Sequence, residues 1–570
     1  MYLKTIVNKK TGRIFLSIVH GYRDKQTGKT YSKTIQALGY LDELKEKMDD
    51  PVAHYTQVAK EMNEKHKESK IPLVFEFQAG DIISRDSVRR KNLGYAVFSQ
   101  IYHELYIHQF MTNRQRNLKI DYLLNNVLKM LVFQRILEPA SKMKTFESKD
   151  RYFEKYDFTL ADVYRSLSRF HQYKDDLLLF LHKQVSQNYD RDTTNVFYDV
   201  TNYYFEIDEP DNLRKNGVSK EHRPNPIVQM GLLMDRQGLP ITYKLFSGNT
   251  NDCSTLLPVL SEVRKQYDIG RMVVVADKGL NTSDNVGYNL IQGDGYVYSQ
   301  TVRGANKELK TFVLGQTGYR KIGEDFRLKS RCYPREITVT NISGKQVKVP
   351  VDEKQVIFYS EKYAKRARAE REPALSKARE LISNPAQFNQ STSYGAAKYI
   401  KDIVYDKKTG EILTAGHIPQ LDLKKIQEEE QYDGYYAVVT SECHLSDEQI
   451  IDTYRGLWQI EESFRITKSD LETRPVYVSR EDHIEAHFLI CFIALLLLRV
   501  LELKTKSKYS PARMIESLKA VSGSHLQQNY YMFDYYDDVV EHIGNALGID
   551  FSKRILALGE IRKILAATKN

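Results

Sequence analysis

Cysteine and tryptophan are scarce in this chain, which has 570 residues but four cysteines and one tryptophan. No two cysteines form a CxxC pair, so the sequence indicates neither a zinc module nor a disulfide framework. Reduced thiols of this kind are typical of an intracellular protein. The four cysteines are Cys253, Cys332, Cys443 and Cys491.

Long apolar runs are also missing. The N-terminus has no apolar segment followed by a small-residue cleavage site, and the longest apolar run, Phe488–Leu498, is too short to cross a bilayer. We expect that run to form a buried helix, and the protein to act in the cytosol with no membrane partner. No GxxxxGK[ST] motif is present, so ATP-driven activity is not indicated.

Basic residues outnumber acidic ones. The 84 Lys and Arg against 74 Asp and Glu give a formal net charge of +10. This balance favours a polyanionic partner such as DNA, with ordinary solubility charge as the alternative. A chain of this length is expected to form two to four domains.

The N-terminal part predicts a small β unit followed by helices. Residues 2–39 alternate polar and apolar positions around turn signals at Asn8–Gly12 and Asp24–Gly28, which predicts a three-stranded meander. A helix is expected from Asp50-Pro51 to about Lys70. Later helices with a basic cluster before them predict a helical DNA-binding module, with a plain basic surface as the alternative. The cluster is Arg89, Arg90 and Lys91, and the helices are 93–106, 118–137 and 160–187.

Two β-branched strands in the middle of the chain run into an aspartate. The strand Asn195–Val200 holds Asp199 near its end, and the strand Arg271–Ala276 is followed directly by Asp277. The order β-β-β-α-β-α-β predicts a mixed five-stranded sheet with flanking helices, in which both acids lie at strand ends where functional groups of α/β proteins gather. The other expected elements are strands at 227–234, 241–245 and 295–298 and a helix at 254–266.

The pattern then changes from about Gly304 to Asp433, where short strands and turns predict an insertion. A charged helix is expected near Lys362–Leu381, and a core strand resumes at Tyr435–Thr440. The helix is predicted to carry a basic stripe, with a solvated face as the alternative. The stripe is Lys362, Lys365, Arg366, Arg368 and Arg371.

The stretch Asp452–Arg474 predicts one amphipathic helix, because apolar residues recur at three- and four-residue steps after Gly456. On that helix Tyr454, Glu461 and Lys468 fall on one face. An acid between an aromatic hydroxyl and a cation suits a site for a metal and a phosphate; a solvated face with ion pairs is the alternative.

Asp199, Asp277 and Glu461 together supply hard oxygen ligands with no cysteine or histidine cluster beside them. Such ligands favour Mg²⁺, with Mn²⁺ as a substitute, over zinc. Two such ions activate an oxygen nucleophile and stabilise the leaving oxygen at a phosphodiester. His483 and His487 have metal-ligand spacing, but the sequence HIEAH has no glutamate directly after the first histidine, where the zinc-protease motif requires it. A structural role is therefore expected.

Three stretches carry a family resemblance: YDVTNYYFE around Asp199, VVVADKG around Asp277, and YRGLWQIEESFRITK from Tyr454 to Lys468. Together they resemble the DDE transposases of bacterial insertion sequences, and most closely the insertion sequence four group with its Tyr-(2)-Arg-(3)-Glu-(6)-Lys signature. The resemblance covers about residues 195–500. It implies an α/β fold with an RNase H-like catalytic core, interrupted by a mainly β insertion, and a catalytic, metal-binding triad of Asp199, Asp277 and Glu461.

The same resemblance implies that Tyr454 and Lys468 hold phosphates at the DNA end. Leu457 stands where the signature has an arginine. Arg455 points about 200° away from Leu457 around the helix, so Arg465, one turn after Glu461, is the better-placed replacement, and which cation completes the grip stays open.

Three further residues have more than one interpretation. Glu462 is the rival of Glu461 as the third ligand, but it points about 100° away, which favours Glu461. Lys278, beside Asp277, either contacts a phosphate or is simply exposed. Trp458 belongs to the core, stacks on an unpaired base, or both, and the core interpretation is favoured.

The expected function is that of a DNA transposase, which cleaves phosphodiesters at the ends of an insertion sequence and transfers the 3′-OH ends to target DNA with two divalent ions per active site. The alternatives are an RNase H-like nuclease without strand transfer and a catalytically inactive DNA-binding derivative. The expected partners are the terminal inverted repeats, the target DNA and a second copy of the chain in the synaptic complex. The expected location is the bacterial cytosol, at the nucleoid.

The predicted organisation has six parts, with helices at both sides of the core. They are a β meander and helix at 1–75, a helical DNA-binding module at 76–190, the first part of the core at 191–303, the insertion at 304–433, the second part of the core at 434–505, and a C-terminal helical region at 506–570.

Overall fold

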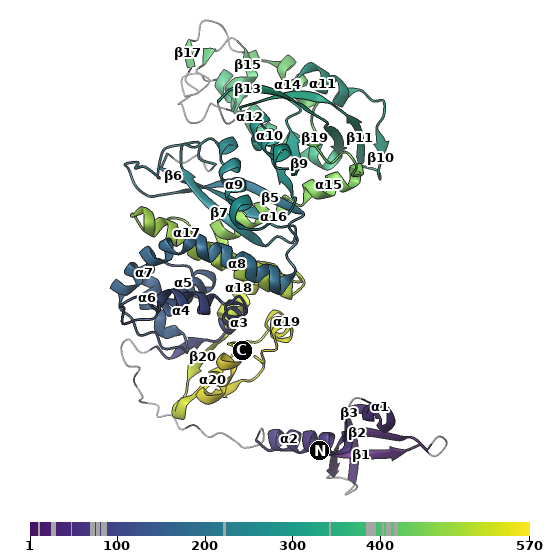
Figure 1. The fold of residues 1–570 in the computed structure, drawn as a ribbon, viewed down its shortest axis with the longest axis vertical. Coiled ribbons are helices and arrows are strands. Elements are labelled where there is room, and N and C mark those ends of the chain that lie inside the picture. Colours follow the sequence, from purple (N-terminus) through teal and green to yellow (C-terminus); the bar gives the residue numbers. More distant parts are fainter. Residues whose placement is uncertain are drawn as a thin grey trace. The chain divides into compact units, whose positions relative to one another are not determined.

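Two compact units make up the chain, Met1–Ser87 and Val88–Asn570 (Figure 1). The finer six-part division stays a prediction. The structure is a computed structural model, and it describes residues 1–8, 12–23, 30–46, 48–68, 75, 80, 82, 88–220, 224–340, 344–383, 395–401, 404–405, 412–414 and 420–569.

The smaller unit contains the three-stranded meander that the alternating sequence predicts. Its strands are antiparallel in the order β1-β2-β3. The expected turn at Asp24–Gly28 lies outside the described residues, as do residues 9–11 of the first turn. The second helix begins as predicted, because the Asp50 carboxylate accepts bonds from the N–H groups of Val52 and Ala53 and Pro51 occupies the first turn. The elements are β1 (Tyr2–Val7), β2 (Ile14–Arg23), β3 (Thr30–Tyr40), α1 (Leu41–Lys45) and α2 (Pro51–Glu68).

A mixed sheet organises the larger unit. Its order is β10-β11-β14-β19-β9-β8-β5-β6-β7. At the β7 end, β5 is antiparallel to β6 and parallel to β8, β6 is antiparallel to β7, and β8 is parallel to β9. This is the order and direction of an RNase H-like core, so the predicted fold class is confirmed. The bounds are β5 (Asn195–Tyr204), β6 (Ile227–Met234), β7 (Pro240–Ser247), β8 (Val273–Ala276), β9 (Gly295–Gln300) and β19 (Tyr435–Thr440), with helices α9 (Leu256–Gln266) and α10 (Ser283–Ile291).

The sheet is wider than the five strands expected from the sequence. Strand β19 pairs with β9 on one side and with β14 of the insertion on the other, so the insertion extends the core sheet instead of standing apart from it (Figure 1). The reason is that Ala437, Val438 and Val439 of β19 are almost fully buried, and an apolar strand of this kind is not left as an open edge. The added strands are β10 (Arg320–Lys321), β11 (Phe326–Cys332) and β14 (Lys354–Ser360).

The rest of the insertion mixes helices with short paired strands. The charged helix is α12, Glu361–Ser383, close to its predicted bounds. The remaining elements are α11 (Lys307–Leu314), β12 (Arg335–Thr340), β13 (Gln346–Val351), β15 (Ile400–Lys401), β16 (Val404–Tyr405), β17 (Ile412–Thr414), β18 (Gln420–Leu421) and α14 (Leu423–Glu430).

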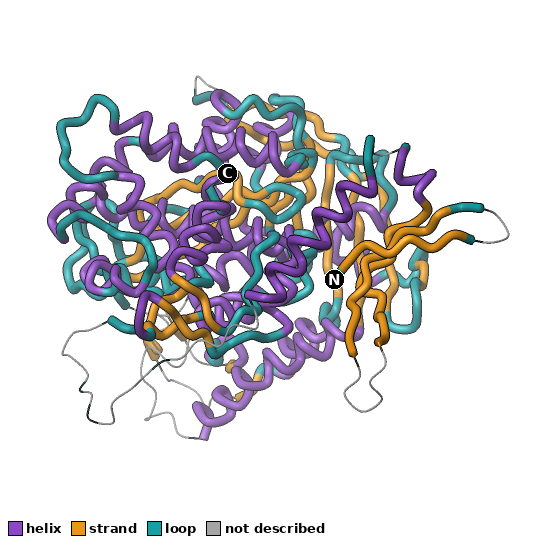
Figure 2. Tube along the Cα trace, turned by 90° about the horizontal axis from the view of Figure 1, so that it is seen from below, coloured by secondary structure: helices purple, strands orange, loops and turns teal. Residues whose placement is uncertain are grey.

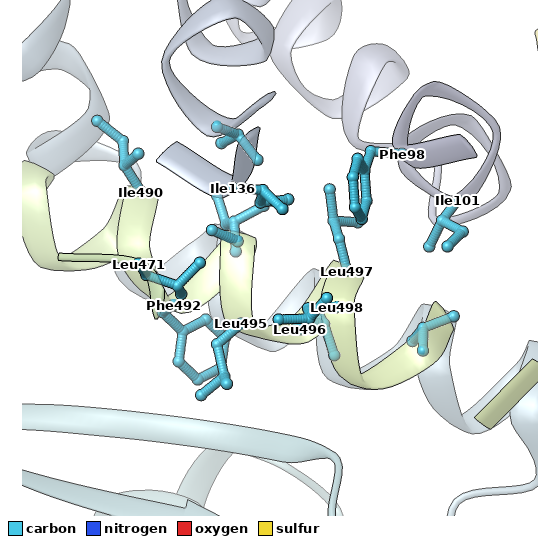
Figure 3. Close-up of a cluster of buried hydrophobic side chains, with 14 of the residues drawn as sticks. Phe98, Ile101, Ile136, Leu471, Ile490, Phe492, Leu495, Leu496, Leu497 and Leu498 are labelled. Atoms are coloured by element: carbon cyan, nitrogen blue, oxygen red, sulfur yellow. The ribbon is translucent and has the colours of Figure 1, made fainter. Parts of the chain in front are cut away.

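Helix α17 (Glu481–Lys504) contains the long apolar run and lies between the sheet and a layer of helices. Figure 3 shows Ile490 and Leu497 pointing toward the helices that carry Ile136 and Phe98, whereas Phe492 points to the opposite side. There the Phe492 ring lies 5.3 Å from that of Tyr243 on β7. Among the described residues α17 alone is long and apolar enough to cross a membrane, but it is buried almost throughout, as predicted for a core helix.

Helices and strands alternate throughout the chain (Figure 2), and the region after α17 contains both. The C-terminal region was expected to be helical, but its short strands pair with one another and with β4, which contains Arg90 and Lys91. Two residues of the basic cluster thus have partners within the protein: Arg90 forms an ion pair with Asp534, and Lys91 donates hydrogen bonds to backbone carbonyls. The helices before the core are α3 (Ala96–Glu104), α4 (Ile107–Gln115), α5 (Leu124–Leu137), α6 (Lys142–Glu147), α7 (Leu160–Gln172) and α8 (Lys174–Tyr189). The sheet and later helices are β4 (Arg90–Asn92), α18 (Pro511–Ala520), β20 (Ser522–His525), β21 (Tyr530–Phe533), α19 (Asp538–Leu547), β22 (Ile555–Ala557) and α20 (Leu558–Ala567).

Candidate active site

Two aspartates lie side by side on the central parallel strands. In the β5–β8 ladder Tyr198 pairs with Ala276, and the next residues are Asp199 and Asp277. Strand β8 ends before Asp277, as predicted. Strand β5 instead continues past Asp199 to Tyr204, because these residues pair with the long strand β6. Both aspartates are half-buried.

Asp277 is held by hydrogen bonds from two other elements. Its Oδ1 accepts a bond of 2.6 Å from Ser299 Oγ, on β9, and a longer one of 3.4 Å from the hydroxyl of Tyr454. Burial and the Asp277 charge both raise the pKa of Tyr454, so its hydroxyl stays protonated as a donor. The strand-end acid and the tyrosine of the later helix therefore belong to one site.

The helix expected at Asp452–Arg474 is divided into three segments. Helix α15 (Asp447–Arg455) ends at Gly456, α16 (Trp458–Arg465) follows, and residues 466–470 form a π-helical turn. A Cβ on Gly456 would lie 2.4 Å from the Phe197 ring of β5, so this residue type lets the helix approach the central strand. The prediction of one continuous helix was wrong because this close approach and the final turn interrupt the regular hydrogen bonding.

The two adjacent glutamates of α16 have different surroundings. Glu462 accepts a bond of 3.1 Å from Arg499, a buried residue of α17. Glu461 is exposed, and its charge acts on Asp199 and on Tyr454. Of the two, Glu461 is therefore the one whose charge reaches Asp199.

Negative charge is concentrated around Asp199. Burial raises its pKa to about 6, and the charges of Asp277 and Glu461 act in the same direction. The charge of Lys220 and the N–H of Val200 oppose this rise. A cation placed among these carboxylates would relieve their repulsion.

Two lysines approach the same aspartate. Lys468, in the π-helical turn, has its pKa lowered to about 8 by burial and by the neighbouring charge of Lys220, while Asp199 opposes the shift. Lys220 donates a hydrogen bond to the carbonyl of Val200, the residue after Asp199. Lys220 could not be identified from the sequence, because a single lysine in a loop carries no spacing signal and only the fold brings it to this strand.

The predicted arginines pair with nearby acids. Arg455 lies 3.2 Å from Asp452. Arg465 lies 3.3 Å from Asp470 and 3.9 Å from Glu462. Leu457, at the signature arginine position, is buried in the main core, which is why an apolar residue suits this position.

Two other predicted residues differ in their surroundings from the expectation. Trp458 is 56% exposed, so the favoured core interpretation was wrong. Arg371 does not belong to an exposed basic stripe, because it is buried and its guanidinium lies 2.5 Å from the Asp433 carboxylate. The spacing of basic residues along one helix could not reveal this ion pair, because Asp433 lies about sixty residues later in the chain, just before β19.

A cleft of about 270 Å³ opens beside Asp277. Lys278, which is exposed, lines it together with Tyr454 and Arg303. Ala367 and Glu370 of α12 line it as well, so the insertion contributes to the immediate surroundings of the site.

A divalent metal suits the chemistry of this site. Asp199, Asp277 and Glu461 offer only carboxylate oxygens, which Mg²⁺ and Mn²⁺ prefer. Within the described ranges no group of three or more His, Cys, Asp or Glu side chains is placed to hold a metal ion, so in this structure the three carboxylates do not form a complete ligand set. His487 instead accepts or donates to buried partners, with Nε2 at 2.9 Å from the Thr473 carbonyl and Nδ1 at 3.1 Å from Lys142, in keeping with its expected structural role.

Comparison with known proteins gives two matches to transposase domains. Residues 3–73 match the N-terminal domain of IS1634 family transposases, and residues 219–497 match the transposase DDE domain. No curated protein sequence matches the chain. Among solved structures, a piggyBac transposase synaptic complex with hairpin DNA has 10% sequence identity over 84% of each chain, with a TM-score of 0.32.

Proposed function

We propose that this chain, which carries an IS1634-type N-terminal domain and a transposase DDE domain, is a DNA transposase that cuts the ends of its element and joins the 3′-OH ends to target DNA. The observations that support this most directly are the adjacent positions of Asp199 and Asp277 on neighbouring parallel strands and the charge that Glu461, on a later helix, exerts on Asp199. The membership in the insertion sequence four group remains a prediction, because the N-terminal match is to the IS1634 family.

In this proposal the three carboxylates hold two divalent ions, Mg²⁺ or Mn²⁺. When bound, such ions activate the attacking oxygen and stabilise the leaving oxygen of a phosphodiester. Ser299 and Tyr454 orient the Asp277 carboxylate through its Oδ1 atom. The other carboxylate oxygen of Asp277 stays available to bind an ion.

The cations of the site bind the phosphates on either side of the cut. Lys468 and Lys220 flank Asp199, and we assign to this pair the part that the signature arginine plays in the related group. Lys278 and the paired Arg455 and Arg465 are outer contacts. The exposed Trp458 is available to stack on an unpaired base.

The reaction joins two DNA ends to one target, so a dimer during synapsis is part of the proposal. The decisive experiment supplies pre-cleaved terminal-repeat ends, a supercoiled target plasmid and Mg²⁺ or Mn²⁺. A transposase gives joined products. A nuclease of the same fold cleaves uncut ends but gives no joined product, and an inactive DNA-binding derivative binds the ends without either reaction.

A further inference from the structure

A basic cleft lies where helix α7 meets the start of α17. It has a volume of about 470 Å³, and its lining includes Tyr164, Arg165, Ser168, Arg169, Arg480 and His483. Helix α7 turns Val163, Leu167 and Phe170 into the core and leaves Arg165 and Arg169, one turn apart, on its exposed face. Helix packing therefore fixes where these two guanidinium groups lie.

The acids near the cleft are engaged in holding the helices. Asp162, the partner of Arg165, also forms the capping box of α7 with Thr159. Asp482 accepts bonds from Ser168 Oγ at 2.7 Å and from its neighbour Arg480 at 2.8 Å. Because these carboxylates are shared with caps and hydroxyls, they leave the exposed guanidinium groups with unused donors.

Arg169 is the least compensated of the three arginines. It donates a hydrogen bond of 3.0 Å to the neutral side chain of Gln172, and within the described part of the chain it has no carboxylate partner. Arg480 is held in place by Asp482 and lies 3.5 Å from Ser168 Oγ, while its side chain is 66% exposed. A planar guanidinium held in this manner suits the oxygens of a phosphodiester.

A continuous segment connects this cleft to the candidate active site. Arg480 follows Lys468, which flanks Asp199, by twelve residues, and the segment between them carries the exposed Tyr477. Twelve residues span at most ~40 Å when fully extended. One turn of duplex DNA spans ~34 Å, so one duplex can reach both places.

We propose that this cleft binds the phosphate backbone of the element-end duplex, within about one helical turn of the phosphodiester that is cut. The inference rests on the proposed function, since it takes the same DNA as its ligand. Phosphate contacts of this kind fix the position of a duplex without reading its sequence.

The test measures binding of terminal-repeat duplexes of two lengths to the full-length protein across a range of salt concentrations. The short duplex ends next to the cut site and the long one extends two turns beyond it. For Arg169→Gln combined with Arg480→Gln we expect about a tenfold or greater loss of affinity for the long duplex, with a salt slope lower by about 2, and unchanged binding of the short duplex. Arg513→Gln, on α18, is the matched exposed-arginine control.

Equal losses on both lengths, or an unchanged salt slope on the long duplex, would overturn the inference. If the melting temperature shows that the double variant does not fold, the same measurement is made on Arg169→Gln alone. Its salt slope on the long duplex is expected to be lower by about 1. Unaltered end binding together with weaker capture of target plasmid would assign the cleft to target DNA and also overturn the proposal. Failure of the proposed function is a separate result, because the unsubstituted protein would then give no joined product, whatever the affinities of the variants.

Discussion

Asp199 and Asp277 follow the paired residues Tyr198 and Ala276 on neighbouring parallel strands, so the sheet itself sets the spacing between the two carboxylates. Glu461 lies on helix α16, which follows Gly456 and packs on the same central strand, and its charge acts on Asp199. The site therefore depends on one ladder register and one close contact between a helix and a strand.

Asp199→Asn, Asp277→Asn and Glu461→Gln are each expected to abolish end cleavage, because an amide is a poorer ligand for a divalent ion and carries no charge. DNA binding should remain. A gel-based cleavage assay with Mg²⁺ and with Mn²⁺ measures this. Glu462→Gln is the control: it loses the contact with Arg499 and some stability, but it should retain cleavage per folded molecule. Loss of activity in Glu462→Gln with retention in Glu461→Gln would reverse the assignment.

Lys220→Ala and Lys468→Ala should each weaken binding of cut ends and lower the salt slope by about 1, since each removes one phosphate contact. Fluorescence anisotropy at several salt concentrations gives the slope. Lys519→Ala, an exposed lysine of α18, should change neither value. A Lys220 variant with the slope of the unsubstituted protein would contradict the role given to that residue.

Gly456→Ala should separate α15 and α16 from β5, because the added Cβ would lie 2.4 Å from the buried Phe197 ring. We expect a stability loss of about 1–3 kcal/mol and a larger loss of cleavage than of DNA binding. Thermal unfolding and single-turnover cleavage measure the two effects. Phe197→Leu in the same chain makes room for the methyl group and should restore part of the activity; no recovery would argue against this contact as the cause.

The protein should lose stability as the pH falls from 7 to 5. Burial lowers the pKa of His103 to about 4, and Lys129 adds to the effect, whereas the bond to the Ser99 carbonyl opposes it. The unfolded chain binds a proton near pH 6.5 and the folded one does not, so stability is full above that value and decreases toward pH 4. His103 accounts for about 2 kcal/mol of the change. His103→Gln should flatten the dependence of the melting temperature on pH; an unchanged dependence would contradict this.

Much of the central sheet could be predicted because its strands are apolar and rich in β-branched residues, such as residues 273–276. An acid after one such strand is by itself often a helix cap or turn former, so only the two acids together with the later helix indicated a site. The same local reasoning identified the face that carries Tyr454 and Glu461. It could not identify Lys220 or the Glu462–Arg499 pair, since both depend on contacts between segments far apart in sequence. Trp458 was assigned to the core on its residue type, but helix α16 turns its apolar face away from that position.

The shared ladder between β9, β19 and β14 limits how this enzyme can be shortened. Removing residues 304–433 would strip the partner from one side of β19 and leave the backbone groups beside Ala437, Val438 and Val439 without hydrogen bonds. An apolar strand with a free edge recruits the same strand of another chain. A version of the protein without these residues would therefore aggregate through β19, so any shortening of the chain has to begin elsewhere.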